Sequence, residues 1–344
     1  MVFPFHLETT KPDMKAITIS EQSETIEIIE KEVPQPTAHQ VLIKLHAAAL
    51  NRRDQWIREG KYPGIKLGTT LGSDGAGVVV NLGEEVDESW LNKEVIINPN
   101  INWGKNPQVQ AGDYNILGMP SDGTFAEYVV VNMDRLHLKP DHLNWEEAAA
   151  LPLGGLTAYR AAFHHGHIHP GEKVLISGVG GGVAQFAFQF ALAVGAEVYV
   201  TSGQEAKIEK SLELGAKGGF IYKEEGWQKR ALQDTGGFDV VIDSAGGNQL
   251  NDFIKLMSPA GRIVFYGATN GMPTKLDVFR MFWNQITIQG STMGNDDEFA
   301  EMLDLINRYE IYPIIDSVHR LENGVIALDR MKSGVFGKVV LKLN

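Results

Sequence analysis

The pattern of hydrophobic and polar positions changes along the chain, from strand-like at the start to alternating strand and helix in the middle. Before residue 150, short β-branched runs are separated by polar or proline-bearing turns, which is typical of strands. Predicted strands span residues 14–19, 26–31, 41–49, 71–81, 94–97 and 124–131. This part of the chain is therefore expected to form a domain rich in β-structure.

From residue 173 onward, short apolar runs alternate with segments whose apolar residues recur every three or four positions. The apolar runs predict strands at 174–177, 197–201, 219–222, 238–243, 262–266 and 286–289. The segments between them predict helices at 183–194, 204–214, 227–233 and 250–257. Strands that alternate with helices predict a doubly wound parallel sheet, so the fold class is α/β.

The first strand–helix–strand unit, at residues 173–201, has four glycines among residues 178–182. Such a unit binds a dinucleotide, because the pyrophosphate lies at the N-terminus of the helix and only small residues let the backbone approach it. Two registers of the fingerprint G-x-G-x-x-G are open. The register at Val179, Gly181 and Ala184 is preferred over the one that starts a residue earlier, because it places a small residue at the helix–strand contact.

Three further segments complete the organisation of the chain. Additional helices are predicted at 51–58, 144–151 and 156–163. Residues 98–120 form a polar loop of a length that is uncommon without a reason. The tail from residue 291 is too short for its own core and is expected to return to the first domain. A length of 344 residues suits two domains, predicted as 1–154 with 291–344 and as 155–290.

Composition narrows the classes of partner and chemistry. The formal net charge of −12 argues against nucleic acid or an anionic membrane as the main partner. The absence of cysteine excludes disulfides, thiolate zinc ligands and cysteine nucleophiles. No apolar run reaches the length of a membrane span, and residues 1–14 lack the basic start and long apolar stretch of a signal peptide. We therefore expect a cytoplasmic protein with a short N-terminal extension.

Several motifs in one order resemble the medium-chain dehydrogenase/reductase family, and within it the zinc-free, quinone-oxidoreductase-like branch. Beside the glycine turn they are AALNRRD (48–54), LGSDGAGVVV (71–80), DGTFAEYVVV (122–131), LPLGGLTAYRA (151–161), FDVVIDSAGG (238–247) and GRIVFYG (261–267). The resemblance implies a GroES-like, β-rich catalytic domain built from both chain ends and a central Rossmann domain. It also implies assembly as a homodimer or homotetramer.

The resemblance also bears on metal binding. Zinc alcohol dehydrogenases of this family hold a catalytic zinc with two cysteines and a histidine, and the matching positions here carry Asn51, Ser73 and Leu153. Leucine cannot ligate a metal, and the other two are poor zinc ligands. Relatives with a structural zinc carry four cysteines in the loop that matches 98–113, where this chain has none. We therefore expect no metal, and the sequence leaves open what holds this loop together.

Three residues near the expected reaction centre are the catalytic candidates. The amide of Asn51 could donate to a developing oxyanion, although asparagine is also favoured as a helix N-cap. Asp54 could orient a hydroxyl group or merely compensate the helix dipole. Tyr62 could donate a proton, with simple packing as its alternative. Arg52 and Arg53 could grip an anion, but solvated helix arginines are the expected outcome.

The cofactor candidates follow from the glycine turn and from the resemblance. They are Thr157, Val179, Gly180, Gly181, Gly182, Val183, Ser202, Lys207, Tyr222 and Gly267. Thr157 resembles a threonine that faces the nicotinamide, while a bond to its own preceding helical turn is the alternative. Enzymes that prefer NAD place an acid after the second strand, where this chain has Gly203. Ser202 and Lys207 could then bind a 2′-phosphate, so NADPH is the predicted cofactor.

Two other clusters have weaker interpretations. His164, His165, His167 and His169 lie between a helix end and a turn, so solvated histidines are expected rather than a metal site. Phe282, Trp283 and Met293 could line an apolar pocket between the domains, with core packing as the alternative.

These observations favour an NADPH-dependent, zinc-independent reductase. Without a Lewis acid an unactivated carbonyl is a poor hydride acceptor, whereas a conjugated acceptor places its charge on an enolate oxygen that ordinary donors can stabilise. Enones, enals, enoyl thioesters and quinones meet this condition. The alternative is an NADPH-binding sensor or structural protein with little turnover.

Overall fold

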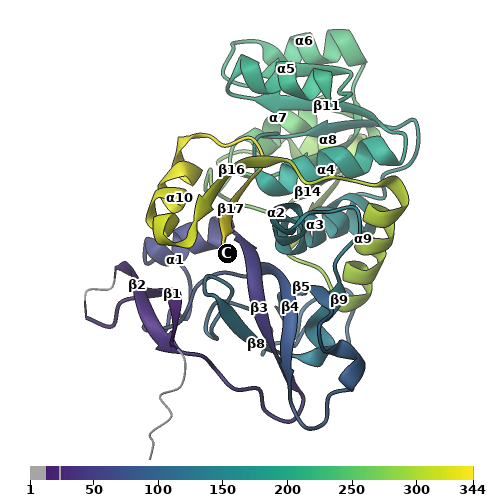
Figure 1. Cartoon of the computed structure of the whole chain (residues 1–344). Coiled ribbons are helices and arrows are strands. Elements are labelled where there is room, and N and C mark those ends of the chain that lie inside the picture. The colour runs from purple at the N-terminus through teal and green to yellow at the C-terminus, as the bar shows by residue number, and fades with distance from the viewer. Residues whose placement is uncertain (1–12, 23–24, 344) are drawn as a thin grey trace, which may run out of the picture.

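The computed structural model describes residues 13–22 and 25–343 (Figure 1). The N-terminal extension expected at residues 1–14 lies, up to residue 12, outside the described residues. Two large sheets dominate the described chain, one below and one above in Figure 1. No helix among residues 13–22 and 25–343 has both the length and the apolar character needed to cross a membrane.

The upper sheet is the doubly wound parallel sheet that the sequence predicts. Its strands are β10 (Lys173–Ile176), β11 (Glu197–Ser202), β12 (Gly218–Ile221), β13 (Phe238–Asp243), β14 (Met257–Phe265) and β15 (Thr287–Gly290). The helices between them are α4 (Gly182–Ala193), α5 (Glu205–Glu213), α6 (Trp227–Thr235), α7 (Gln249–Leu256) and α8 (Val278–Trp283). The spatial order β12-β11-β10-β13-β14-β15 confirms the Rossmann prediction. The order reverses between β10 and β13, so a ligand is expected beyond the carboxyl ends of these two strands.

The lower sheet belongs to the predicted GroES-like, β-rich part, and both ends of the chain contribute to it. Its order is β16-β17-β3-β4-β5-β9, with β8 paired to β3. The bounds are β3 (Gln40–Ala49), β4 (Asp74–Leu82), β5 (Glu94–Ile97), β8 (Tyr128–Asn132), β9 (Leu136–Leu138), β16 (Ile315–Arg320) and β17 (Lys338–Lys342). Because β17 pairs antiparallel with β3, the C-terminal tail returns to the first sheet, as expected.

Smaller elements surround this sheet. They are β1 (Asp13–Ile19) paired with β2 (Ile26–Glu32), β6 (Asn100–Ile101) paired with β7 (Asn115–Ile116), and the helices α1 (Arg52–Arg58), α2 (Trp145–Ala150) and α10 (Gly324–Arg330). The predicted strand at 124–131 is wrong in its first half, because β8 begins only at Tyr128. The backbone N–H groups of Thr124 and Phe125 donate instead to the carbonyls of Gly72 and Leu71.

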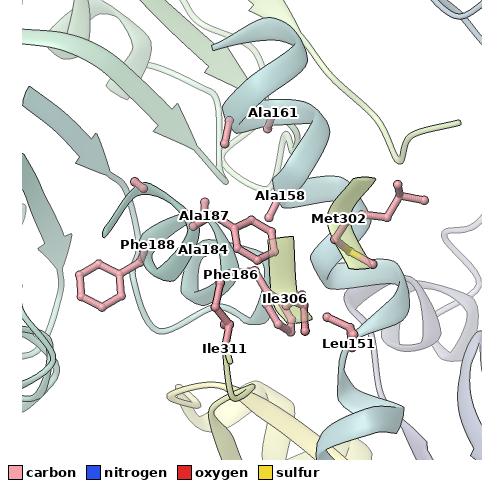
Figure 2. Close-up of a cluster of buried hydrophobic side chains, with 14 of the residues drawn as sticks. Leu151, Ala158, Ala161, Ala184, Phe186, Ala187, Phe188, Met302, Ile306 and Ile311 are labelled. Atoms are coloured by element: carbon pink, nitrogen blue, oxygen red, sulfur yellow. The ribbon is translucent and has the colours of Figure 1, made fainter. Parts of the chain in front are cut away.

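The junction between the two sheets is a core of three helices, α3 (Pro152–Tyr159), α4 and α9 (Asp296–Tyr309). Figure 2 shows Phe186 of α4 and Met302 and Ile306 of α9 meeting in this core. A Cβ on Gly155 would lie 2.7 Å from the sulfur of Met302, so Met302 packs directly against the backbone of α3 at this glycine. The predicted division places α9 in the β-rich domain, yet α9 packs on α3 and α4. The domain boundaries, 1–154 with 291–344 and 155–290, therefore stay a prediction.

The cysteine-free loop at 98–120 is held in part by the buried side chain of Arg160. The Arg160 guanidinium donates to the carbonyls of Pro107 and Gln108, at 3.1 and 2.8 Å, and lies over the ring of Trp103. Arg160 is itself fixed by a buried ion pair with Glu298 of α9, at 2.7 Å. Backbone acceptors and one buried aromatic ring therefore hold the loop in place.

The aromatic residues of α8 do not form the pocket that the sequence left open. Phe282 and Trp283 are 64% and 71% exposed. They therefore neither line a pocket between the domains nor pack in a core, the two possibilities that the sequence left open. Met293 is buried in the junction core, as the packing alternative expects. The pattern misled because no described part of the chain covers the aromatic side chains of α8.

Candidate active site

The glycine turn follows β10 directly and leads into α4. Gly178 has φ +59°, a conformation that residues with side chains rarely adopt, so the tight turn falls at this position. The register preferred from the sequence begins one residue later, at Val179, and stays a prediction. Ala184 packs in the core, fully buried, which fits the reason for that preference.

The rest of the turn is a cradle in contact with the C-terminal part of the chain. A Cβ on Gly180 would lie 2.5 Å from the carbonyl oxygen of Val335, and one on Gly182 would lie 2.7 Å from Cδ of Lys338. The N–H of Gly337 donates to the carbonyl of Gly180 at 3.0 Å. Glycine is thus required because the segment before β17 presses against the turn, which leaves the N-terminus of α4 at the floor of a groove.

The inner part of this groove is a cavity of about 280 Å³, here called the inner cavity. It lies beyond the carboxyl ends of β10 and β13, where the topology places a ligand. Its lining includes Asn51, Arg52, Gly182, Ser244, Tyr266 and Lys338. The inner cavity therefore joins the helix N-terminus to polar side chains of the β-rich part.

The outer part of the groove is a second cavity, of about 270 Å³, here called the outer cavity. Its lining includes Ser202, Gly203, Gln204, Lys207, Tyr222 and Lys223. Gly181, Met331 and Val335 line both cavities, so the two follow each other along the glycine turn. A turn that only glycine can form, a helix N-terminus and a pair of lysines fit a bound dinucleotide.

Lys207 of α5 bridges the two halves of the molecule at the outer cavity. Its Nζ donates to the carbonyl of Val335 at 2.8 Å. Burial lowers the pKa of the Lys207 ammonium below its ordinary value. No carboxylate among the described residues forms an ion pair with it, so this charge can serve an anionic ligand.

Seven of the ten predicted cofactor residues line one or both cavities. They are Gly180, Gly181, Gly182, Val183, Ser202, Lys207 and Tyr222. Val179 is fully buried, and Gly267 packs against the carbonyl of Ser244. Thr157 donates from Oγ1 to the carbonyl of Leu153 at 2.8 Å, which is the bond to the preceding helical turn. The cofactor roles of all ten residues stay predictions.

The positions that match metal ligands in zinc-containing relatives meet around one buried carboxylate, Asp74 of β4. Its Oδ2 accepts from Nδ2 of Asn51 at 2.8 Å and from Nζ of Lys338 at 2.9 Å. Its Oδ1 accepts from the backbone N–H of Leu153 at 2.8 Å. Lys338 also donates to Oδ1 of Asn51, at 2.6 Å. A closed network of three side chains therefore forms this wall of the inner cavity.

The third position, Ser73, is bonded to Arg53 of α1. The Nη1 of Arg53 lies 2.5 Å from Oγ of Ser73 and 2.8 Å from the carbonyl of Leu117. Nε and Nη2 both donate to Oη of Tyr62 at 3.3 Å. The expectation of a solvated arginine is therefore wrong for Arg53, since Ser73, Tyr62 and carbonyls of the loop surround its buried guanidinium. Arg52 is exposed and lines the inner cavity.

The predicted catalytic residues differ in how they reach the inner cavity. Asn51 lines it and is also the N-cap of α1, so both of its interpretations fit the geometry. Asp54 is fully buried, and its Oδ2 accepts from the backbone N–H of Asn51 at 2.7 Å. Burial raises the pKa of the Asp54 carboxyl to about 6, against the opposing charge of Arg53. Neither Asp54 nor Tyr62 lines the inner cavity, and their roles stay predictions.

The donor set at this wall does not fit a zinc ion. Leu153 offers no ligand atom, and the oxygens of Asn51 and Ser73 already accept from Lys338 and Arg53. Elsewhere in residues 13–22 and 25–343 no group of three or more His, Asp or Glu side chains is arranged to hold a metal. In the histidine cluster, His164 lies 3.0 Å from Glu298, and burial lowers the pKa of His165 to about 4.

Among the cavity residues that the sequence reasoning missed are two lysines. Lys338 lies 287 positions from Asn51, and no local pattern links them. Lys223 could have been found from the sequence, because it directly follows Tyr222, which was already a cofactor candidate. A lysine is common in any sequence, so composition alone does not single out either residue.

Comparisons with known proteins agree with this geometry. Residues 37–141 match the alcohol dehydrogenase GroES-like domain, and residues 182–308 match the zinc-binding dehydrogenase family. The chain is 34% identical to the zinc-type alcohol dehydrogenase-like protein YogA of Leptosphaeria maculans, over 90% of this chain and 92% of that protein. It is 31% identical to the quinone oxidoreductase of Mus musculus, over 90% and 91%.

A solved structure described as an NAD-dependent alcohol dehydrogenase has the same fold. Its TM-score is 0.90 at 34% identity, and the match covers 96% of this chain and all of that one. Similarity of sequence and of fold thus extends over nearly the whole chain. The chain is an oxidoreductase of the medium-chain dehydrogenase/reductase family, whose members use a nicotinamide cofactor.

Proposed function

We propose that the chain is an NADPH-dependent reductase that delivers hydride to the β-carbon of a conjugated acceptor without a metal ion. One observation carries the proposal: the inner cavity joins the glycine turn to a wall of fixed N–H donors on Asn51 and Lys338. When bound, the reduced dinucleotide supplies the hydride. The chain's own residues then hold the acceptor and stabilise the charge that develops on its oxygen.

The choice of acceptor follows from the donor set at the wall. Reduction of an isolated carbonyl places negative charge on an alkoxide, for which a metal dication is the usual partner. Addition to an enone, enal, enoyl thioester or quinone delocalises the charge into an enolate or phenolate. Hydrogen-bond donors suffice for such an oxyanion when they are fixed and shielded from water.

An acceptor screen tests this proposal against both alternatives. Purified protein is given NADPH with a deuterium on the transferred position, together with enones, quinones and simple aldehydes. We expect deuterium on the β-carbon of the reduced enone. Deuterium on a carbinol carbon would establish carbonyl reduction instead, and no turnover with any acceptor would favour the sensor or structural alternative.

Metal dependence is tested on the same preparation. We expect far less than one zinc per chain by elemental analysis, and turnover that survives treatment with a strong chelator. Stoichiometric zinc that turnover requires would contradict the metal-free part of the proposal.

The preference for NADPH rests on the outer cavity. It holds two lysine ammonium groups, Lys207 and Lys223, and Gly203 stands where an acid would repel a 2′-phosphate. Ser202 and Tyr222 add hydroxyl donors to the same cavity. The structure with TM-score 0.90 is described as NAD-dependent, so the ratio of the two affinities decides this part of the proposal.

The proposed homodimer uses the open edge of the upper sheet. β15 is the last strand in the sheet order, and the adjacent helix α8 exposes Phe279, Phe282 and Trp283. A second copy could continue the sheet across β15 and cover these rings. Sedimentation equilibrium should give a mass of two or four chains, and Trp283→Asp should shift it toward one. A wild-type monomer at micromolar concentration would contradict the assembly.

A further inference from the structure

Arg160 is a buried cation at which three separate parts of the chain meet. It begins a π-helical segment, Arg160–His165, that continues α3, and the residue is only 2% exposed. Its Nη1 donates to both carboxylate oxygens of Glu298 on α9, at 2.8 and 2.7 Å. Its Nη2 donates to the carbonyls of Pro107 and Gln108 in the cysteine-free loop, at 3.1 and 2.8 Å. One guanidinium therefore joins the end of α3, the start of α9 and the loop.

Glu298 is also fixed by bonds that do not involve Arg160. It is the third residue of α9, and its Oε2 accepts from the backbone N–H of Asn295, the N-cap, at 2.7 Å. In return the N–H of Glu298 donates to the Asn295 side chain at 2.8 Å. A carboxylate in the first turn of a helix is favoured by the helix dipole as well. The carboxylate that receives Arg160 is thus held by the cap of α9.

A second set of bonds ties the beginning of the loop to the same place. Nδ2 of Asn100 donates to the carbonyl of Gly294, and Nδ2 of Asn98 donates to the Asp296 carboxylate at 2.9 Å. Oη of Tyr114 donates to Oδ1 of Asn100 at 2.7 Å, which brings the later part of the loop to the same anchor. The loop is therefore attached to the start of α9 at several points along its length.

Contacts inside the loop connect its two ends. The guanidinium of Arg160 lies 5.0 Å from the centre of the Trp103 ring, and that ring meets the Tyr114 ring edge-on at 5.3 Å. The backbone N–H of Leu117 donates to the carbonyl of Pro99 at 3.0 Å. Because the loop is packed in this way, a displacement near Arg160 is passed on to Leu117.

The end of the loop contacts the backbone next to the inner wall. The carbonyl of Leu117 accepts from Oγ of Ser73 at 2.9 Å and from Nη1 of Arg53 at 2.8 Å. Ser73 directly precedes Asp74, the carboxylate that accepts from Asn51. A shift of the loop end would therefore move the backbone that holds Asp74 and, through it, the side chain of Asn51.

We propose that Arg160 is a positioning residue for the reaction: paired with Glu298, it holds the cysteine-free loop so that the loop end keeps the inner wall in place. Arg160 lines neither the inner nor the outer cavity, so it acts only through the loop. Arginine suits this task, because a planar guanidinium bonds a carboxylate on one side and carbonyls on the other, whereas a lysine ammonium is a single point charge. The inference rests on the proposed function, which defines what the inner wall binds.

The test variant is Arg160→Met with Glu298→Gln, because removal of the arginine alone would leave a buried carboxylate unpaired. The glutamine keeps an oxygen that can accept from the N–H of Asn295. The matched control is Arg262→Met with Glu172→Gln, which removes an ion pair far from the loop; Glu172 likewise accepts from a backbone N–H three residues earlier. Arg160→Lys keeps the charge pair and is the conservative variant.

Turnover with the best acceptor of the screen is measured at saturating substrates, beside the Kd for NADPH and the midpoint of thermal unfolding. We expect kcat to fall about 10–100-fold in the double variant at Arg160 and Glu298, because a misplacement of about 1 Å caused far from the chemistry can cost this much. The Kd for NADPH should stay within about twofold of wild type, since the glycine turn is untouched. Arg160→Lys should recover part of kcat, and the control should keep it.

Hydrogen exchange followed by mass spectrometry gives a readout that does not depend on turnover. In the double variant at Arg160 and Glu298, the amides of the loop at 98–120 should exchange faster than in wild type. Those of residues 71–76, which the loop end contacts, should also exchange faster. In the control neither segment should change.

The outcomes separate this inference from the proposed function. Faster exchange confined to the loop, with kcat unchanged, would overturn the inference and leave Arg160 a residue of local structure. A fall in kcat without faster exchange at 71–76, or an equal fall in the control, would overturn it too. If wild type reduces no acceptor, the proposed function fails and the exchange at 71–76 decides: faster exchange there supports the inference, and unchanged exchange overturns it.

Discussion

The inner and outer cavities lie along one groove, but they hold their charges in opposite ways. At the inner cavity Lys338 is buried and fixed by a carboxylate and an amide. At the outer cavity Lys207 is half-buried and bonds only a carbonyl, while Lys223 and Tyr222 are exposed. The inner wall is a closed network, whereas the outer wall is a set of separate side chains beside solvent.

This difference has a physical consequence for mutation. A charge in a closed, dry network interacts strongly, and the removal of one partner leaves the others unsatisfied. A charge beside solvent is screened, and its neighbours can turn to water. Changes at the inner wall should therefore affect both folding and chemistry, while changes at the outer wall should affect only the choice of cofactor.

The largest expected effect is that of Asp74→Ala at the inner wall. It leaves Lys338 buried without its carboxylate and removes the acceptor for Asn51 and for the N–H of Leu153. We expect a loss of about 3–5 kcal/mol in the free energy of unfolding, measured by urea denaturation. Asp329→Ala, which breaks an exposed ion pair with Arg58, is the control and should cost far less. Equal losses of unfolding free energy in the two variants would contradict the difference between the buried network and a solvent-exposed ion pair.

The second effect concerns Asp54 and depends on pH. Its pKa rises from the ordinary value of 3.8 to about 6 in the folded chain, so the folded state holds the proton more tightly than the unfolded state. The stability contributed by this group is present below about pH 4 and is lost as the pH rises to about 6. Asp54→Asn should remove that decline and raise stability at pH 7 by at most about 3 kcal/mol.

Urea denaturation of wild type and Asp54→Asn at several pH values between 4 and 8 measures this effect. The backbone N–H of Asn51 keeps an acceptor in the variant, because the asparagine side chain retains one oxygen. Parallel pH profiles, or a variant less stable than wild type at pH 7, would show that the Asp54 charge is satisfied in the folded protein.

The third effect is on turnover. Removal of one oxyanion donor typically costs about 10²–10³ in rate, and Asn51→Ala should cost about 10–100-fold because Lys338 remains. The Kd for NADPH should stay within about twofold of wild type, since the outer cavity is untouched. The unfolding midpoint is measured beside the rate to separate chemistry from the lost N-cap. Unchanged turnover at saturating substrate would remove Asn51 from the site.

The smallest effect is at the outer wall. Lys207→Met and Lys223→Met should each lower the ratio of NADPH to NADH affinity by about tenfold, with stability almost unchanged. Fluorescence titration of both cofactors measures the ratio, and Lys229→Met on α6 serves as the control for loss of a lysine away from the groove. A wild-type protein that binds NADH as tightly as NADPH would refute the assignment.

The sequence predicted the dinucleotide half of the site because that half is local. Period and glycine content set β10, the turn and α4, and the carboxyl ends of neighbouring parallel strands bring Ser202, Lys207 and Tyr222 to one edge. The positive φ of Gly178 places the tight turn directly after β10, and the register of the glycine fingerprint stays a prediction.

The catalytic half depended on contacts that no local pattern encodes. Arg53 reads as a surface arginine until the loop after residue 115 and Ser73 enclose it, and Lys338 meets Asn51 only because β17 pairs with β3. By itself, the sequence determined the fold class, the glycine turn and the loss of the metal ligands. Only the tertiary structure decided that Arg53 and Lys338 bond to Ser73 and Asn51, because burial and hydrogen-bond partners far apart in the chain are set when the two sheets pack together.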